Sequence, residues 1–411
     1  MAPPKRENSM LHCLWRVVLL LASPSVIPVT TGNLLGMVRN TTDPTCLQRR
    51  VQCSSLAAIT ADGTTLPRQN DVAGPNLIQA LQVVAGSVSY SIATDPNANA
   101  TGSNTVLVSV DVPTGTIVAT VALPFVRVGM LAEGMFVHYD AATKELLVVG
   151  EMETPPPSLP HATAGDHVVF RVNPRAGTMV AVGFFGGDDG IANVGAYDAT
   201  SRILWAQCIY GNGRTYSLLG MDTRSGAVTH NVTDPYMAGG MACSVNGRCF
   251  LIGITHLNLR PGASFERVLV ELSCSDNSGN SSSGTGGNAR LSCTISSTPL
   301  LRLPNVCIML GGLMTIESKS QIIYSVLQNS SATSPCSGSS SSSDIRSAAA
   351  GTVGNNLVVW RPRKGRAAAV ATDTGFKLLV IDFSTVVPAV VGEPVLCASV
   401  MLCPISISAR V

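Results

Sequence analysis

The chain alternates short apolar runs with polar turns, and it shows almost none of the three-to-four-residue apolar spacing of amphipathic helices. Several runs, such as Leu146–Val149, contain no polar residue. Strands that are buried on both faces have this pattern, whereas strands with one wet face alternate apolar and polar residues. The chain is therefore predicted to be all-β, with sheets covered on both sides. Asn76–Val84 is the one short helix candidate, and it fits a strand equally well.

One hairpin motif consists of a strand, a Tyr-Asp pair or a relative, a short polar turn and a second apolar strand. Its copies lie at 136–149 and 195–205, with degenerate copies at 241–252 and 313–326. The Asp opens the turn because its side chain can accept hydrogen bonds from backbone N–H groups ahead of it. The motif therefore predicts a recurring antiparallel hairpin.

A second hairpin motif consists of a strand, an Asp or Asn, three residues, a Gly and another strand. The Gly closes the turn because it adopts positive φ at little cost. Copies begin at Asp111, Asn173 and Asp222, and a copy without the glycine begins at Asp382.

The two motifs alternate, so each pair supplies four antiparallel strands. Four-stranded units that recur every 40 to 60 residues, roughly, are typical of β-propeller blades. The predicted fold is a β-propeller of antiparallel four-stranded blades, six or seven in number, with six favoured. The stretch 33–73 would complete the ring or add a partial seventh blade, and 394–411 offers no obvious closing strand. The predicted blades are 77–123, 130–185, 191–234, 238–297, 307–350 and 355–391.

The turns resemble those of β-propeller repeat proteins with Asp-x-x-Thr-Gly hairpins, a broad group that includes YVTN-type and quinoprotein-type repeats. The resemblance covers most of the chain after about residue 77. It implies architecture more than function. The tryptophan docking motifs of quinoprotein blades are missing, since the chain has only Trp15, Trp205 and Trp360. A quinone cofactor is therefore not expected.

The N-terminus has the pattern of a secretory signal. Lys5 and Arg6 form a basic start, and an interrupted apolar stretch runs to Val29. That stretch is too broken for a membrane span, which needs about 20 mostly apolar residues. We expect a signal peptide at 1–31, a single propeller domain at 32–411, no transmembrane span, and a secreted or extracellular-surface location.

N-glycosylation sequons and paired cysteines agree with secretion. N-x-Ser/Thr sequons become glycan acceptors only in the secretory pathway, where disulfides also form. The sequons are at Asn40, Asn99, Asn231, Asn280 and Asn329. The close cysteine pairs, predicted to be disulfides, are Cys46/Cys53, Cys243/Cys249, Cys274/Cys293 and Cys397/Cys403. Apart from Cys13, which lies in the expected signal peptide, Cys208, Cys307 and Cys336 remain, an odd number, so at least one of them is not paired with another of the three.

Two low-complexity segments interrupt the repeat. Residues 275–292 are rich in Ser, Gly and Asn, and Cys274 and Cys293 flank them. Residues 329–355 contain a serine run and have the composition of a disordered segment. Both are expected to project from the rim of the ring.

The charge balance excludes some partners. The formal net charge is +2, and only 13% of the 411 residues are charged, against about 25% in an average globular protein. Nothing global therefore points to a nucleic-acid partner. One dense basic cluster, Arg361–Arg366, could bind polyanions such as sulfated glycans, although it is also typical of a solvated hairpin tip.

Candidate chemistry lies in the loops that join successive blades, which in propellers approach the central channel. Asp188 and Asp189 offer hard oxygen ligands, and Glu133 could face the same opening, so a channel Ca²⁺ is one hypothesis. A tight Gly-rich turn with solvated acids is the alternative. His138 and His256 could act as acid or base from the channel, or could be structural histidines; His161 and His167 are expected at the surface.

Two functions follow from these features. The first is a non-enzymatic interaction module that binds a protein or glycan partner, since no catalytic motif is present and propellers commonly offer a rigid face. The alternative is a hydrolase or lyase with a metal-assisted site in the channel, formed by Glu133, Asp188, Asp189 and His138.

Overall fold

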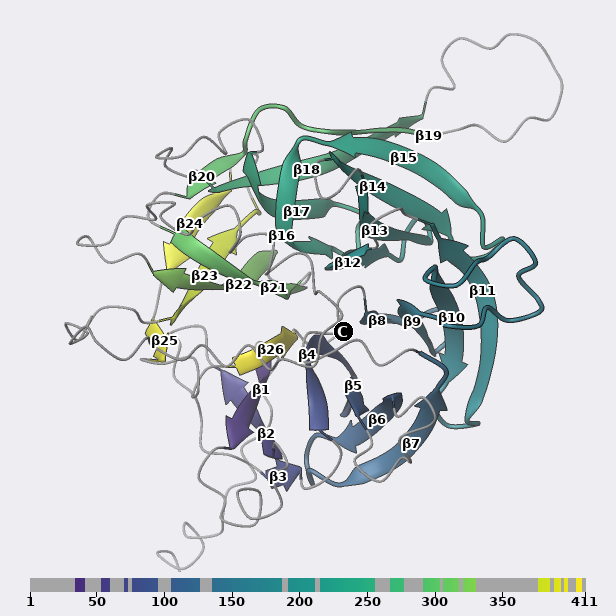
Figure 1. Cartoon of the computed structure of the whole chain (residues 1–411). Helices are drawn as coiled ribbons and strands as arrows, with labels where there is room; N and C mark the ends of the chain where they lie inside the picture. Colours follow the sequence, from purple (N-terminus) through teal and green to yellow (C-terminus); the bar gives the residue numbers. More distant parts are fainter. Residues whose placement is uncertain are drawn as a thin grey trace, which may run out of the picture.

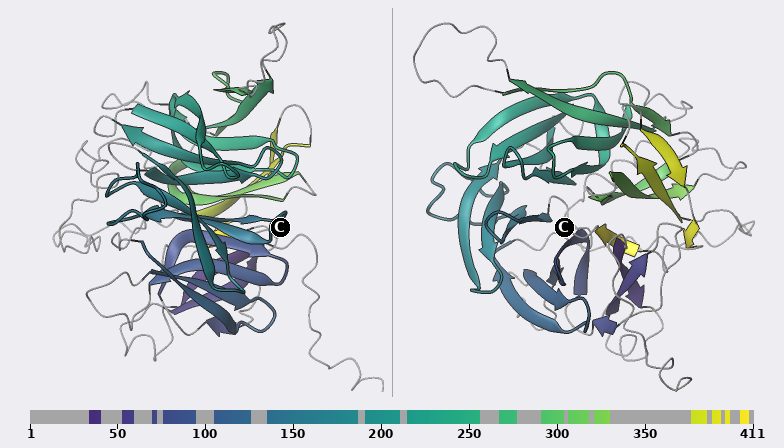
Figure 2. Two further views of the ribbon diagram at one scale, coloured as in Figure 1. Left: turned by 90° about the vertical axis from the view of Figure 1, so that its right-hand side faces the viewer. Right: turned by 180° about the vertical axis from the view of Figure 1, so that it is seen from behind.

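A computed structural model describes the fold through residues 34–40, 53–59, 70–72, 76–94, 105–125, 135–186, 191–210, 215–255, 267–276, 291–303, 306–317, 321–329, 376–384, 388–392, 395–397 and 404–408. Within these ranges the regular elements are all β-strands. Figure 1 looks along the axis of a ring of sheets, and Figure 2 shows the same ring from the side and from behind. The predicted all-β propeller with antiparallel four-stranded blades is confirmed.

Consecutive strands build five of the sheets, which we call blades 1 to 5. Blade 1 contains β4 (Asn76–Ala85), β5 (Val88–Thr94), β6 (Thr105–Asp111) and β7 (Ile117–Leu123). Blade 2 contains β8 (Phe136–Asp140), β9 (Glu145–Glu151), β10 (His167–Asn173) and β11 (Thr178–Phe185). Blade 3 contains β12 (Ile191–Asp198), β13 (Ile203–Tyr210), β14 (Thr215–Asp222) and β15 (Val228–Asp234).

Blades 4 and 5 each carry an additional short strand. Blade 4 contains β16 (Tyr236–Cys243), β17 (Cys249–Thr255), β18 (Arg267–Asp276) and β19 (Leu291–Ile295), with β20 (Leu301–Leu303) beside β18. Blade 5 contains β21 (Val306–Glu317), β22 (Ile322–Asn329), β23 (Phe376–Asp382) and β24 (Ala389–Gly392), with β25 (Val395–Cys397) beside β23.

A sixth sheet joins the two ends of the described chain, and we call it the closing sheet. Its strand order is β26 (Pro404–Ser408), β1 (Leu34–Asn40), β2 (Cys53–Ile59) and β3 (Asn70–Val72). The C-terminal strand lies antiparallel to the N-terminal one, with Leu35 opposite Ser408. In Figure 1 the closing sheet lies between blade 5 and blade 1.

The structure corrects the predicted blade count. Six or seven blades of consecutive strands were expected, but consecutive strands form only five, and the described residues form no seventh sheet. The predicted blades 307–350 and 355–391 are one blade, because β22 pairs with β23 across the long segment 330–375. The expectation of no closing strand near the C-terminus is also wrong, since β26 is that strand. The helix candidate Asn76–Val84 lies in strand β4, so of its two interpretations the strand is confirmed.

Burial explains why the apolar runs are unbroken. Leu146–Val149 on β9 are fully buried, because blades pack against neighbours on both faces. One hydrophobic cluster extends through blades 1, 2 and 3, and a second joins blade 3 to blade 4 around Trp205. The outer strands alternate instead, as in β15, since one side of each faces solvent.

The turns have the predicted chemistry. The Asp111 carboxylate accepts hydrogen bonds from the Thr114 backbone N–H at 3.1 Å and from its hydroxyl at 2.6 Å. Asn173 Oδ1 accepts from two backbone N–H groups in the equivalent turn of blade 2. The glycines that close these turns have positive φ, at Gly115, Gly177 and Gly226. Turns between first and second strands and between third and fourth strands lie at the same end of every blade, and we call this end of the ring the turn face.

Candidate functional site

On the turn face, side chains of three successive blades each form a hydrogen bond with the next blade. The first connection is Arg171 on β10, which forms an ion pair with Glu145 on the adjacent strand at 3.3 Å. Its Nη2 donates a hydrogen bond to the Thr223 carbonyl of blade 3 at 2.8 Å. Arg171 therefore links blade 2 to the turn that follows β14.

The second connection joins blades 3 and 4. The Asp198 carboxylate accepts hydrogen bonds from the Thr200 N–H at 2.9 Å and from the Ser201 hydroxyl at 2.6 Å, which fixes the turn after β12. The Thr200 hydroxyl then donates to the Val245 carbonyl in the β16–β17 turn at 2.9 Å. A tightly ordered turn in one blade thus holds a turn in the next.

The third connection joins blades 4 and 5 through Arg248. Its guanidinium forms a two-point ion pair with Glu271, at 2.8 and 3.1 Å, and donates to the Phe383 carbonyl at 3.2 Å. It also lies 4.9 Å from the ring centroid of Phe250 and 5.4 Å from that of Phe383. Glu271 holds the pKa of Arg248 above its ordinary value. The result is a charge-assisted clamp packed on two aromatic rings.

The charged pairs of Arg171 and Arg248 occupy equivalent places with the charges exchanged. Arg171 lies opposite Leu147 in the strand register, and Leu147 follows Glu145 by two residues. In the same way, Glu271 lies opposite Phe250, and Phe250 follows Arg248 by two residues. In both cases the acceptor is the carbonyl that follows the last residue of the next blade's third strand. The repeat conserves the connection between blades even though the positions of the charges are exchanged.

Apolar side chains are exposed at the same end of the ring. Val245 in the β16–β17 turn is 67% exposed, Val180 near the start of β11 is 66% exposed, and Val118 near the start of β7 is 57% exposed. Singly exposed valines are common on protein surfaces. Here they stand beside turns that hydrogen bonds hold in place, so they can contact a partner with little loss of backbone freedom.

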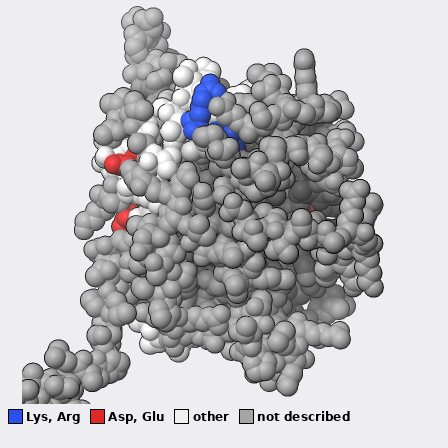
Figure 3. Space-filling model, turned by 90° about the vertical axis from the view of Figure 1, so that its left-hand side faces the viewer, with Lys and Arg blue, Asp and Glu red and all other residues white. Residues whose placement is uncertain are grey.

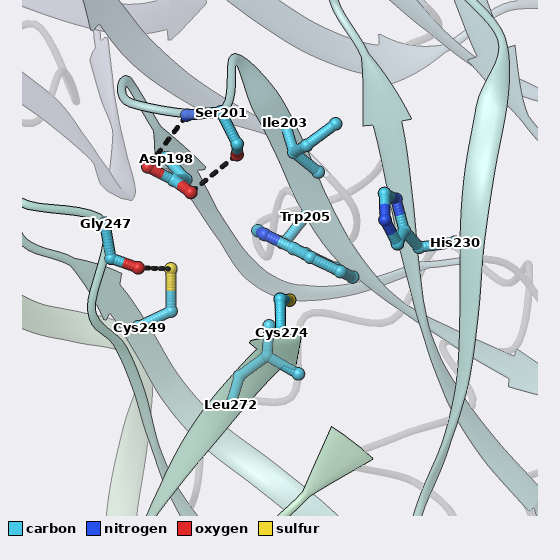
Figure 4. Close-up of a pocket in the computed structure, with 9 residues that line it drawn as sticks. All are labelled: Asp198, Ser201, Ile203, Trp205, His230, Gly247, Cys249, Leu272 and Cys274. Atoms are coloured by element: carbon cyan, nitrogen blue, oxygen red, sulfur yellow. Dashed lines mark hydrogen bonds between the residues drawn. The ribbon is translucent and has the colours of Figure 1, made fainter. Parts of the chain in front are cut away.

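A small pocket of about 90 Å³ lies between blades 3 and 4. Figure 4 shows the Trp205 ring across its middle, with His230 beside one end of the ring and Asp198 and Ser201 on the far side. The rings of Trp205 and His230 have centroids 5.3 Å apart, and the His230 Nδ1 shares a hydrogen bond with Thr229. Asp198 is already occupied by its own turn, so the pocket contains no paired acid and base.

At the end of blade 3 away from the turn face, a buried carboxylate joins this blade to the first strand of blade 4. Asp234, 3% exposed at the end of β15, accepts hydrogen bonds from the Gln207 side chain and from the Tyr236 N–H. Gln207 also donates to the Tyr236 carbonyl at 3.2 Å, and its Oε1 is buried without a hydrogen-bond partner. Burial raises the pKa of Asp234 to about 6, although the two hydrogen bonds oppose that shift.

His138, the predicted acid or base, lies at the seam between blades 2 and 3. Its ring packs at 5.6 Å from Phe136, and Phe136 in turn closes over Gly195 of β12. Burial lowers the pKa of His138 to about 4, and a hydrogen bond to the Gly195 backbone opposes that shift. Its Nε2 is buried without a partner. His138 is therefore held neutral near pH 7, and its catalytic role stays a prediction.

The other residues of the channel hypothesis, Glu133, Asp188 and Asp189, lie outside the described residues, and so do His256 and the basic cluster Arg361–Arg366. Among the residues that are described, no group of three or more His, Cys, Asp or Glu side chains could hold a metal ion. The predicted Ca²⁺ site is untested.

Of the two histidines that were predicted to lie at the surface, one is exposed and the other is buried. His161 is exposed as predicted, but His167 on β10 is 4% exposed. The Pro-rich loop suggested a surface position, yet His167 is the first residue of a central strand that pairs with both β9 and β11.

Two of the predicted disulfides are confirmed, Cys243–Cys249 and Cys274–Cys293. Each joins two neighbouring strands of blade 4, as the close spacing of the cysteines suggested. The predicted Cys46–Cys53 disulfide involves Cys46, which lies outside the described residues, and it stays a prediction.

The fourth predicted disulfide, between Cys397 and Cys403, also stays a prediction, because Cys403 lies outside the described residues. Cys397 ends β25 of blade 5, and Cys403 directly precedes β26 of the closing sheet.

Of the sequon asparagines, Asn231 is described: it is exposed on outer strand β15. Side chains of the other four, Asn40, Asn99, Asn280 and Asn329, are not described. Glycosylation at all five positions stays a prediction.

Figure 3 views the side of the ring that carries β20 and β24. The described part of that surface is small and carries a few basic and acidic side chains. Over the same described ranges, no helix is long and apolar enough to cross a membrane.

Comparisons with known proteins identify similar folds. No family model matches the chain, and no curated protein matches it. Hydrazine synthase of Kuenenia stuttgartiensis is similar over 71% of this chain and 75% of its own, with 13% identity and a TM-score of 0.42. The β-propeller domain of the Trilobed protease from Pyrococcus furiosus matches 77% of this chain and 71% of its own, with 8% identity and a TM-score of 0.37.

A third solved structure, the WD40 repeats of RRP9, covers 63% of this chain and 78% of its own, with 10% identity and a TM-score of 0.35. Enzymes and repeat domains are both present among such matches. Similarities this distant transfer no activity, substrate or partner to the chain.

Proposed function

We propose that the chain is a secreted or surface-displayed β-propeller that acts as a non-enzymatic interaction module, with the turn face as its binding surface. The partner class that suits the exposed valines is a protein, although the chain could also present this face to a glycan.

The observation that carries the proposal is the run of side-chain-to-backbone hydrogen bonds that links blades 2, 3, 4 and 5 on one face. A surface held in one arrangement before binding loses little conformational entropy when a partner docks. Val180 and Val245, both about two-thirds exposed, supply apolar contact area within that rigid frame.

The proposal also assigns the repeats of this chain to a group of propeller repeats. We infer that the repeats belong with the Asp-x-x-Thr-Gly, YVTN-like group. In support, Asp111 binds Thr114 through both its N–H and its hydroxyl, and Asp140 accepts from the Thr143 hydroxyl at 3.1 Å. The threonine hydroxyl donates a hydrogen bond to the aspartate of the turn, which an alanine in this position could not do.

Secretion is proposed on two supporting features. Cross-strand disulfides are rare in reducing compartments and common outside them. Asn231 is exposed on β15, the outer strand of blade 3, where a glycan could be attached. The signal peptide at 1–31, the domain at 32–411 and the glycans at the other four sequons belong to the same proposal.

The test uses the full chain, secreted from cultured cells, together with the double variant V180E/V245E and the control variant A122E, at an exposed position of β7 at the end away from the turn face. Proximity cross-linking at a cell surface would identify a partner held by the wild-type chain and the control and lost from the double variant. A partner retained by the double variant, or none at all, would contradict binding through the turn face.

The alternative, a metal-assisted hydrolase or lyase, rests on Glu133, Asp188 and Asp189. A thermal melt with Ca²⁺ and then with chelator tests it, because a ligand that binds only the folded state raises the apparent stability. A rise in Tm that Asp188→Ala abolishes would favour the alternative. An unchanged Tm would favour the interaction module.

A further inference from the structure

Blade 4 carries four cysteines, one on each of the strands β16 to β19. Cys243 and Cys249 join β16 to β17, and Cys274 and Cys293 join β18 to β19. Both disulfides connect residues that lie directly opposite each other in the strand register. Each disulfide therefore links strands that the hydrogen-bond ladder already holds together.

The two disulfides differ in access. Cys249 is 2% exposed and belongs to the hydrophobic cluster between blades 3 and 4, whereas Cys274 is exposed and Cys293 is half-buried. Thiol–disulfide exchange needs a thiolate to approach one sulfur along the S–S axis, so access largely decides which disulfide reacts. Only Cys274–Cys293 has an exposed member among these two pairs.

Opening Cys274–Cys293 leaves the sheet intact. β18 pairs with β19 over Leu272–Asp276, and it also pairs with β17 and with β20. The central strand is therefore held on both edges without the disulfide. A bond that is reachable and dispensable for the fold has the character of an exchange site rather than of a structural staple.

Cys208, the free thiol among the described residues, cannot act as the attacking thiolate. Cys208 is buried, and burial raises the pKa of its thiol to about 12, so it is almost entirely protonated near pH 7. The attacking thiolate must come from outside the described part of the chain.

We propose that Cys274–Cys293 is a thiol–disulfide exchange site that takes an external thiol, while Cys243–Cys249 stays closed. The external thiolate bonds to Cys274 Sγ, the Cys274–Cys293 bond breaks, and the electron pair leaves on Cys293 Sγ, which takes a proton from water. A second external thiolate then attacks the first external sulfur, releases Cys274 as a thiol and leaves as the external disulfide. The chain gains two electrons, and two external thiols are oxidised.

The pocket between blades 3 and 4 provides a readout. Cys274 and Cys249 both line it, together with Trp205, which is 1% exposed (Figure 4). A disulfide beside an indole quenches its fluorescence, so opening Cys274–Cys293 should change the emission of Trp205. The variant Trp205→Phe shows which tryptophan gives the signal: the change should disappear in it, because the signal comes from Trp205 and not from the other two tryptophans.

The experiment exposes the folded full-length chain to glutathione in one arm and to reduced thioredoxin in the other, followed by alkylation and peptide mass mapping. We expect Cys274 and Cys293 to be alkylated at least 10-fold faster than Cys243 and Cys249, with the circular dichroism unchanged. Reaction in only one arm identifies the external thiol as a small molecule or a protein.

The double variants C274S/C293S and C243S/C249S are the matched controls. The emission change should disappear in the first and persist in the second. Opening of both disulfides at one rate that follows global unfolding, or earlier opening of Cys243–Cys249, would overturn the proposal. Should a double variant fail to fold, the alkylation rates in the wild-type chain decide alone.

Discussion

At the residue scale, the glycines of the repeated turns are equivalent in sequence but not in their surroundings. Gly177 and Gly226 close the same turn in blades 2 and 3, with φ of 65° and 73°. A Cβ on Gly177 would meet nothing within 4 Å, whereas one on Gly226 would lie 1.8 Å from the Val182 carbonyl oxygen. The backbones of blades 2 and 3 therefore touch at Gly226.

Gly177→Ala and Gly226→Ala separate conformational strain from this close contact. Both variants should lose about 1 kcal/mol because alanine disfavours positive φ. Gly226→Ala should lose roughly 2 kcal/mol more because the blades must move apart. Urea unfolding of the two variants measures the difference, and equal losses would show that the contact does not limit packing.

A second residue-scale prediction concerns Asp234. Because its folded pKa is raised from 3.8 to about 6, the folded state holds the proton more tightly than the unfolded state. Stability from this group is therefore greatest below pH 4 and is lost as pH rises to about 6. The side chain of Asp234→Asn does not titrate, so this loss is absent from the variant. Its free energy of unfolding should therefore rise relative to that of the wild type by up to about 3 kcal/mol between pH 4 and 7.

Denaturant titrations at pH 4, 5.5 and 7 test this dependence. A difference in unfolding free energy between Asp234→Asn and wild type that grows with pH is the expected result. A constant difference across these pH values would mean that the carboxyl titrates normally in the folded chain.

At the element scale, the Arg248 clamp is expected to hold blade 4 against blade 5. Arg248→Ala removes the ion pair with Glu271, the bond to the Phe383 carbonyl and the contacts with two aromatic rings. We expect a loss of about 1 to 3 kcal/mol by chemical denaturation. Arg224→Ala is the control: Arg224 pairs with Asp222 within one turn and is solvent-exposed, so its removal should leave stability unchanged. Similar losses in both variants would contradict an inter-blade role for Arg248.

Strand β26 is the other element with a specific expected role, because it closes the ring. Deleting 404–411 should lower the Tm and broaden the unfolding transition, since blade 1 and blade 5 lose the strand that lies between them. Deleting 409–411 is the matched control and should melt like the full chain. A 404–411 deletion that melts normally would mean that the ring does not depend on β26.

Much of the element pattern could be predicted from local sequence. Asp111, Asn173 and Asp222 each accept bonds within the next three residues, so their turns depend on neighbours that the sequence places together. The pairing of β22 with β23, and of β1 with β26, depends on contacts between distant segments, and no local pattern encodes those. For the same reason the blade count was wrong while the blade type was right.

The cysteines show the same division between local and distant structure. Cys243 and Cys249 were paired correctly because one hairpin brings them together. Cys397 ends β25 of blade 5 and Cys403 directly precedes β26 of the closing sheet, so their pairing depends on how two sheets meet, and it stays a prediction.

The candidate site was harder to predict than the fold. The sequence drew attention to acids in the loops between blades, whereas the side chains that connect blades on the turn face are Arg171 on strand β10 and Thr200 and Arg248 in turns. Their roles arise from the carbonyl of the next blade, which lies 45 to 135 residues further along the chain. The Ser-x-Asn-Gly turn before Arg248 did not indicate that the Arg248 side chain contacts the next blade.

At the scale of the whole molecule, five blades and a closing sheet surround one axis, and bonds across the turn face connect four of the blades. Such a ring resists deformation more than its separate hairpins would. Its proposed role depends on this rigidity, since a preorganised face can bind without ordering itself first.

Secretion adds a whole-molecule prediction. When the full chain is expressed in a eukaryotic secretory system, the medium should contain a form whose mass falls on treatment with a peptide N-glycosidase. Asn231→Gln should remove one glycan from that form. A chain retained in the cytosol without glycans would contradict the secreted assignment.

The most direct test of the account is the affinity of the identified partner for the wild-type chain, for V180E/V245E and for A122E, measured with purified proteins. The account predicts that V180E/V245E weakens binding at least 10-fold, about 1.4 kcal/mol, and that A122E, which lies away from the turn face, binds like the wild type. Equal affinity for all three proteins would contradict the turn face as the binding surface.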